Sequence, residues 1–284
     1  MKSALDCIPC FVAQALNVAR LATHDPQAHE RILREALRRA SEADLAQSPA
    51  RFGRGIHRLV RELTEQADPY LAVKQESNRL SLALLPAWRE RLRSAENPRL
   101  AAVKMAIAAN IIDFGIKGDL TAEQIPAALG SSLAAPLMGE VEALFAAAES
   151  AQDILFLADN AGELVIDRLL LELLPRQKIT VVVKGGPAIN DALRADATAA
   201  GLDGWIAVVD TGCDGAGIVL EACSLEFQRR FAQADLIIAK GQANFESLDG
   251  GAQNIFFLFK VKCPVVARHI GQAVGSLVLH RNTR

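Results

Sequence analysis

The stretch Ile154-Leu155-Phe156-Leu157-Ala158-Asp159-Asn160-Ala161-Gly162-Glu163 decides the fold. Its first five residues form an apolar run without polar alternation, which is typical of a β-strand that helices cover on both faces. The run then changes abruptly to charged, amide and glycine residues, as a buried strand does where it leaves a sheet. We therefore predict a strand at 154–158 of a parallel α/β sheet, with a polar loop at its carboxyl end.

Further short apolar runs extend this interpretation to the second half of the chain. They lie at 179–183, 205–209, 236–239 and 255–258, and a shorter strand is predicted at 265–267. Counted from Ile154, the first four runs start at 154, 179, 205 and 236. They are spaced roughly 25 to 30 residues apart, which is the period of a βα unit. Amphipathic stretches separate the runs, so we predict a doubly wound, mostly parallel sheet in residues 146–284.

Residues 1–145 follow a different pattern, with apolar residues at helical spacing and no convincing strand. Ile32, Ala36 and their neighbours form one stripe, and the segment 101–112 is so apolar that it predicts a buried helix. The predicted fold class is therefore α/β. A helical N-terminal domain (1–145) precedes an α/β domain (146–284) that carries the functional site.

Composition and charge exclude several classes of protein. The 284 residues carry a net charge of −2 with both signs spread along the chain, unlike a basic nucleic-acid footprint. No apolar run reaches the length of a membrane span, and the first residues lack the apolar core of a signal peptide. The five cysteines, an odd number, favour a reducing compartment. We expect a cytoplasmic protein that binds neither nucleic acid nor membrane; its oligomeric state is left open.

Polar clusters follow each of the first four predicted strands, beginning at Asp159, Lys184, Asp210 and Lys240. Because the carboxyl ends of parallel strands meet at one edge of a sheet, these clusters converge. Carboxylate and amide oxygens suit Mg²⁺ or Mn²⁺, whereas lysines and glycine-rich backbone suit phosphate oxygens. A metal and a cationic cradle in one crevice are the parts that phosphoryl transfer needs.

The same residues also allow a structural interpretation. Asp159 and Asn160 could cap the following helix, and so could Asn190 or Asp191. Pro187 is placed to be the first residue of a helix, which would put Asn190 and Asp191 in its first turn, near the crevice.

Several motifs together resemble the damage-control phosphatases, once called domain of unknown function 89. They are Asp159-Asn160-Ala161-Gly162-Glu163, Asp191, and Lys240-Gly241-Gln242-Ala243-Asn244-Phe245-Glu246. Cys7-Ile8-Pro9-Cys10 and the stretch 109–115 resemble the mainly prokaryotic branch with N-terminal cysteines. The likeness runs from about residue 3 to residue 270, and the combination is specific although each motif alone is not.

The resemblance implies a helical domain fused to a Rossmann-like α/β/α domain with one divalent cation (Mg²⁺, Mn²⁺, or Co²⁺/Ni²⁺). By matching position, Asp159, Asn160 and Asp191 are the expected catalytic residues and metal ligands. The implied reaction is hydrolysis of phosphomonoesters of small metabolites such as sugar phosphates, in metabolite damage control. Contacts to the phosphorylated substrate are expected from Lys240, Lys184, Gly162, Glu163, Asn244, Asn110 and Asp113. Ala216, in the loop that begins at Asp210, departs from the family pattern, which commonly has a proline before the later glycine of this loop.

Two polar features stay open at this point. Asn110 and Asp113 lie at helical spacing in an apolar segment, either as an interdomain hydrogen-bonded pair or as residues that face the crevice. Cys7 and Cys10 could form half of a zinc site, a redox pair, or a structural pair at a helix start. The alternatives to a phosphatase are therefore a non-enzymatic nucleotide- or metabolite-binding protein and a thiol redox protein that uses Cys7 and Cys10.

Overall fold

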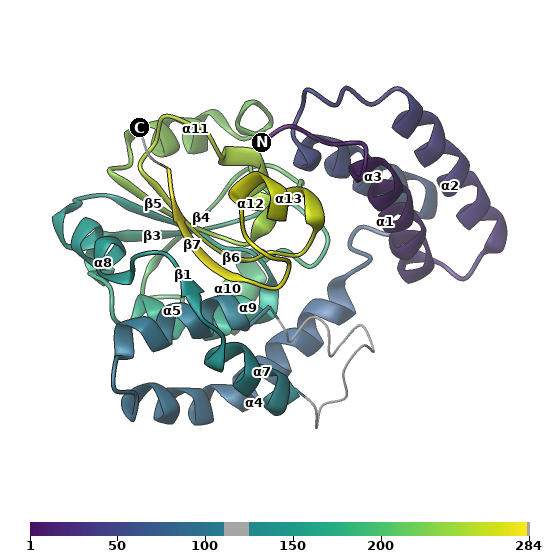
Figure 1. The fold of residues 1–284 in the computed structure, drawn as a ribbon. Helices are drawn as coiled ribbons and strands as arrows, with labels where there is room; N and C mark the ends of the chain where they lie inside the picture. The colour runs from purple at the N-terminus through teal and green to yellow at the C-terminus, as the bar shows by residue number, and fades with distance from the viewer. Residues whose placement is uncertain (111–124, 283–284) are drawn as a thin grey trace.

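A seven-stranded sheet forms the centre of the computed structural model, which describes residues 1–110 and 125–282 (Figure 1). Its strand order is β1-β7-β6-β5-β2-β3-β4, and all neighbouring strands are parallel except β6 and β7. The strands are β1 (Leu137–Met138), β2 (Ile154–Leu157), β3 (Ile179–Val183), β4 (Ala207–Asp210), β5 (Leu236–Lys240), β6 (Ile255–Lys260) and β7 (Leu277–Arg281). This mostly parallel α/β sheet confirms the predicted fold class.

Helices surround the sheet and also form a group of their own. They are α1 (Cys7–Ala22), α2 (Pro26–Ser41), α3 (Pro49–Thr64), α4 (Leu71–Arg93), α5 (Pro98–Ala108), α7 (Ile125–Ala134), α8 (Val141–Ser150), α9 (Ala161–Leu171), α10 (Arg194–Ala199), α11 (Leu225–Gln233), α12 (Gln242–Leu248) and α13 (Pro264–Ile270). None of the helices in the described ranges combines the length and apolar character needed to span a bilayer.

Strand β2 is apolar throughout because helices cover both of its faces. Ile154 and Phe156 pack into a core with α4, α5 and α9, whereas Leu155 and Leu157 pack into a second core with α11 and α12. The chain runs from β2 outward through β3 and β4, and then returns to β5 on the other side of β2. This reversal creates a switch point between β2 and β5, where α/β sheets bind their ligands.

Helices α1 to α3 form a three-helix lobe beside the sheet (Figure 1). The lobe has its own small core, which includes Ala15, Val18, Ile32 and Ile56. Helices α4 and α5 pack instead on α9 and contribute to the core of the sheet. The predicted boundary near residue 145 therefore does not separate the hydrophobic cores, because part of the helical half covers one face of the sheet.

The strand predictions are confirmed for the five longer runs, with shifts of one or two residues at their ends. The strand predicted at 265–267 is wrong, because Pro264 starts helix α13 there. Strands β1 and β7 were not predicted. The first has only two residues, and the second lies between β1 and β6, where it pairs antiparallel with β6 beyond the βα repeats.

Candidate active site

Backbone pairing brings the three predicted metal ligands together. Asp159 and Asn160 directly follow β2, and Asp191 lies in the loop after β3. An isolated antiparallel bridge joins Asn160 and Asp191, and the amide of Ala192 donates a 2.8 Å hydrogen bond to the carbonyl oxygen of Asp159. The two loops are thus tied to each other at the carboxyl edge of the sheet.

The same pairing corrects the helix predicted to start at Pro187. Helix α10 begins only at Arg194, and the residues between follow a turn and an extended path. The carbonyl oxygen of Asn190 accepts a 3.0 Å hydrogen bond from the amide of Ala161. A helix through Asn190 would give up this pairing, so Asp191 reaches the site from a loop rather than from a helix N-terminus.

The carboxylates of this site lie in an environment with too little positive charge. Asp159 and Asp191 are 6% and 3% exposed. Burial raises the pKa of Asp159 well above its ordinary value, and the nearby charges of Glu163 and Asp191 raise it further. Burial also raises the pKa of Asp191 to about 6, although Lys184 opposes this. Buried carboxylates that repel each other are stabilised by a cation between them.

The donor set fits a hard divalent cation. Asp191 Oδ2 is buried without a hydrogen-bond partner, and the nearest cation, Lys184 Nζ, lies 3.5 Å from it. The Asn160 side-chain nitrogen donates to Glu163 (2.7 Å), so its amide oxygen points away from Glu163. Within the described residues no three His, Cys, Asp or Glu side chains form a metal-ligand group. A cation here would therefore be held by two carboxylates and an amide.

Lys240 lies beneath the site in a buried ion-pair network. It is 1% exposed, and its Nζ donates to Asp167 (2.6 Å) and to Glu163 (3.3 Å). Burial lowers the pKa of Lys240, but the two carboxylates outweigh burial and raise it above its ordinary value. Glu163 also accepts hydrogen bonds from Asn110 and Asn160. The network positions Glu163 and, through it, Asn160. The predicted phosphate contact of Lys240 stays a prediction, and this pairing argues against it.

Four more predicted contact residues also have structural partners. Lys184 Nζ donates to the carbonyl oxygen of Gly217 (2.6 Å), and Asn244 donates to that of Lys240 (2.7 Å). Gly162 allows close packing, because a Cβ there would lie 2.9 Å from the backbone oxygen of Ser77. Asn110, on the helical side, bonds Glu163. Asp113 lies outside the described residues. These four residues therefore support the site from within the protein and do not line the crevice.

A crevice of about 770 Å³ opens above the predicted ligands, between the lobe and the strand-end loops. Asp159, Asn160 and Asp191 line its inner side, and residues of α1 line the opposite side. Cys10 belongs to this α1 wall, so the cysteine motif lies closer to the site than the sequence indicated. No disulfide joins Cys10 and Cys7, and burial raises the pKa of both thiols.

Lys262 is a lining residue that the sequence did not single out. It is exposed, it lines the crevice, and its charge lowers the pKa of both Asp159 and Asp191. It follows β6, whose end has no glycine-rich cluster like those after β2 to β5. The only available signal was its place at the carboxyl end of a parallel strand.

Ile189 links the lobe to the loop that carries the predicted metal ligand Asp191. It has a φ of 47°, a left-handed conformation that is uncommon for a β-branched residue. Its side chain packs against the core of the lobe, and it also lines the crevice. Backbone strain of this kind is kept only where the surrounding structure enforces it. Packing between the lobe and the sheet domain therefore fixes the backbone two residues before Asp191.

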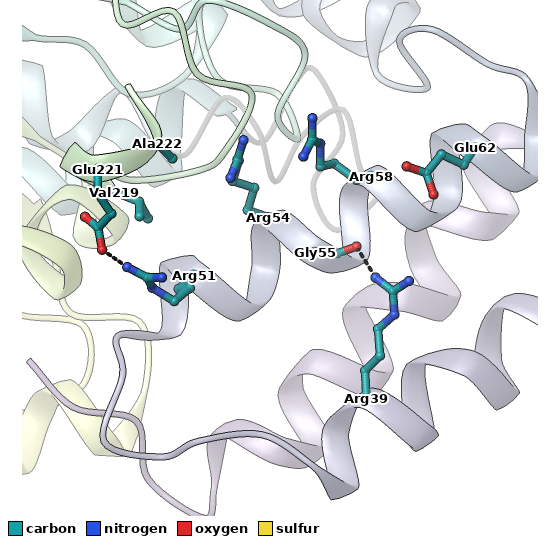
Figure 2. A pocket seen from close by; sticks show the side chains of 9 residues that line it. All are labelled: Arg39, Arg51, Arg54, Gly55, Arg58, Glu62, Val219, Glu221 and Ala222. Atoms are coloured by element: carbon teal, nitrogen blue, oxygen red, sulfur yellow. Dashed lines mark hydrogen bonds and ion pairs between the residues drawn. The ribbon is translucent and has the colours of Figure 1, made fainter. Parts of the chain in front are cut away.

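A second hollow, of about 500 Å³, lies along α3 (Figure 2). It is lined by Arg39, Arg51, Arg54, Gly55, Arg58, Glu62, Val219, Glu221 and Ala222. Figure 2 shows Arg51 directed to Glu221 and Arg39 to the carbonyl of Gly55. Arg54 and Arg58 contact Asp214 at 2.8 and 3.0 Å. These guanidinium groups already have protein partners. Their ion pairs with Asp214 and Glu221 hold α3 against the segment that follows β4.

The fold and the crevice together define a class: an α/β protein with a crevice at the switch point of its sheet, under a helical lobe. Residues 3–278 match the damage-control phosphatase ARMT1-like domain, and the chain belongs to this family. The family named from the sequence motifs is thereby confirmed.

Individual relatives match along nearly the whole chain. The damage-control phosphatase PH1575 of Pyrococcus horikoshii is 32% identical, covering 99% of both chains. The damage-control phosphatase of Archaeoglobus fulgidus is also 32% identical, covering 98% of both. The crystal structure of the Pyrococcus horikoshii protein, described as a DUF89 family protein, superimposes over 100% of both chains with a TM-score of 0.90.

Proposed function

We propose that this member of a phosphatase family is a metal-dependent hydrolase of phosphomonoesters of small metabolites, such as sugar phosphates. One observation carries the proposal. Two buried carboxylates and an amide converge at the floor of a large crevice, with positive charge too weak to satisfy them. Without a cation, this floor would repel a phosphate group.

The chain's own residues have distinct roles in this proposal. A divalent cation, when bound by Asp159, Asn160 and Asp191, supplies the charge that attracts and polarises the phosphate. The buried pair of Lys240 and Glu163 orients Asn160 through the hydrogen bond from Asn160 to Glu163. Lys262, on the crevice wall, is the side chain that we propose binds phosphate oxygens.

The lobe supplies the other half of the site. Helix α1 closes the crevice from the side opposite the carboxylates, which reduces the access of bulk water to the reacting group. The thiol redox alternative gains no support here, because burial raises the pKa of Cys7 and Cys10 and so reduces their thiolate fraction.

A chromogenic aryl phosphate assay tests the proposal. We expect hydrolysis with Mg²⁺, Mn²⁺, Co²⁺ or Ni²⁺, and loss of hydrolysis when a chelator removes the cation. A panel of sugar phosphates then tests the substrate class. Chelator-resistant turnover would contradict metal dependence, and binding without turnover under every cation would favour a non-enzymatic metabolite-binding protein.

A further inference from the structure

The wall that α1 presents to the crevice carries the polar side chains Gln14, Asn17 and Arg20 among apolar ones such as Ala13. Cys10, Gln14, Asn17 and Leu21 recur at a spacing of three or four residues, with Arg20 beside them, so they share one side of the helix. The buried side of α1 consists of Cys7, Phe11, Ala15, Val18, Ala19 and Ala22. The polar side therefore contributes nothing to the core of the lobe.

The polar groups of this wall are not engaged elsewhere. In the described part of the chain, no hydrogen bond or ion pair involves the side chain of Gln14, Asn17 or Arg20. Arg39 of α2 and Arg54 of α3 differ, since each pairs with a carboxylate. Each amide offers both donors and an acceptor, so Gln14 and Asn17 present unused hydrogen-bonding capacity to the cavity.

The opposite wall carries a third unengaged amide. Asn190 is 4% exposed, lines the same crevice, and its side-chain nitrogen is buried without a partner. A buried donor of this kind is normally paired. The cavity of about 770 Å³ also exceeds what a phosphate group alone would fill, and it lies in the size range of small-molecule sites.

We infer that Gln14, Asn17 and Asn190 bind the leaving group of the ester and select a moiety that carries several hydroxyl or amide groups. The inference rests on the proposed function for the phosphate end of the substrate. Uncharged amides pair best with partners that donate and accept in turn. A hydrocarbon leaving group would bury all three amides without partners, so the site discriminates against it.

Steady-state kinetics on two esters tests the inference. The double variant Gln14→Leu/Asn17→Leu removes both α1 amides and keeps side chains of similar size. Gln27→Leu is the matched control, because Gln27 is exposed on α2 and is not part of the crevice wall. We expect the ratio of kcat/KM for a hexose phosphate to that for p-nitrophenyl phosphate to fall roughly tenfold or more in the double variant. An unchanged ratio overturns the inference.

Calorimetric binding separates this inference from the proposed function. Titration of the hexose phosphate and of inorganic phosphate into the cation-loaded protein needs no turnover. We expect the double variant to lose more affinity for the hexose phosphate than for inorganic phosphate. This difference without hydrolysis in the wild type would contradict the proposed function alone. Equal losses for both ligands, or none, overturn the leaving-group assignment, and Asn17→Ala repeats the measurement if the double variant does not fold.

Discussion

The carboxylate of Asp159 lies directly against the backbone of Gly241, so that a Cβ on Gly241 would come within 2.1 Å of Asp159 Oδ2. Asp159 follows β2 and Gly241 follows β5, the two strands that flank the switch point. Gly241 also has a φ of 84°, which favours glycine. The position of Asp159, the first proposed metal ligand, is therefore set by the absence of a side chain on the neighbouring strand end.

Gly241→Ala should abolish metal-dependent hydrolysis. The added methyl group displaces the Asp159 carboxylate, and a shift of about 1 Å at a catalytic group costs on the order of a hundredfold in rate. Gly250→Ala is the control, since Gly250 has a φ of 79° but a Cβ there meets nothing within 4 Å. Both variants bear a backbone cost of about 1 to 2 kcal/mol. Equal activity in the two variants would contradict this role of Gly241.

Asp159→Asn should remove activity and raise the melting temperature of the metal-free protein. The substitution removes one of several buried negative charges that oppose each other. Thermal unfolding in the presence of a chelator measures the gain. Added Mn²⁺ should then stabilise the wild type and not the variant. A variant that is less stable than the wild type without metal, yet still responds to Mn²⁺, would show that Asp159 is not a ligand.

Lys240→Met should lower the stability of the protein, whereas Lys262→Met should weaken substrate binding. Removing the buried Lys240 leaves Asp167 and Glu163 without a cation and should cost roughly 3 to 5 kcal/mol of unfolding free energy. Lys262 is exposed on the crevice wall, so its loss should raise KM and leave the stability close to that of the wild type. Urea denaturation and steady-state kinetics on both variants decide the matter. A reversed pattern would restore Lys240 as the phosphate contact.

His57 should make the protein less stable in mild acid. Burial lowers its pKa to about 4 from 6.5, and the charge of Arg61 contributes. Below pH 6.5 the imidazole of residue 57 is protonated in the unfolded chain, whereas in the folded protein it stays neutral until about pH 4. The free energy of unfolding is therefore highest above pH 6.5 and falls as the pH decreases toward 4. At pH 5 the loss is about 2 kcal/mol. Urea denaturation at pH 7 and pH 5 should show a smaller loss for His57→Leu than for the wild type.

The cysteine pair should not be needed for hydrolysis, since a hard cation with oxygen ligands gains little from thiols. We expect Cys7→Ser/Cys10→Ser to retain most turnover under reducing conditions. Iodoacetamide should inhibit the wild type by placing a bulky group on Cys10 in the crevice, and more quickly at alkaline pH because the pKa of the thiol is raised. A folded, metal-loaded double variant without activity would place the thiols in the reaction.

The sequence predicts the floor of the crevice better than its walls. The site position of Asp159 and Asn160 could be predicted because an apolar strand ends directly before them. The pairing of Lys240 with Asp167 could not be predicted, because Asp167 is one of three charged residues in the mostly apolar helix α9 and its role depends on β5 lying alongside. Gln14 and Asn17 likewise have the pattern of an ordinary exposed helix face. Only the packing of the lobe over the sheet turns that face toward the crevice.

Ile189 has a consequence for how this protein family varies between organisms. Its side chain sits against the core of the lobe, while its backbone leads directly to Asn190 and Asp191. A change of side-chain volume in that core therefore shifts the backbone of the loop that carries Asp191, so the lobe core and this loop cannot vary independently. Across aligned homologues we expect position 189 to covary with lobe positions such as Val18 and Tyr70. Chimeric chains that join the lobe of one homologue to the sheet of another should be most stable and most active when residue 189 comes from the same homologue as the lobe.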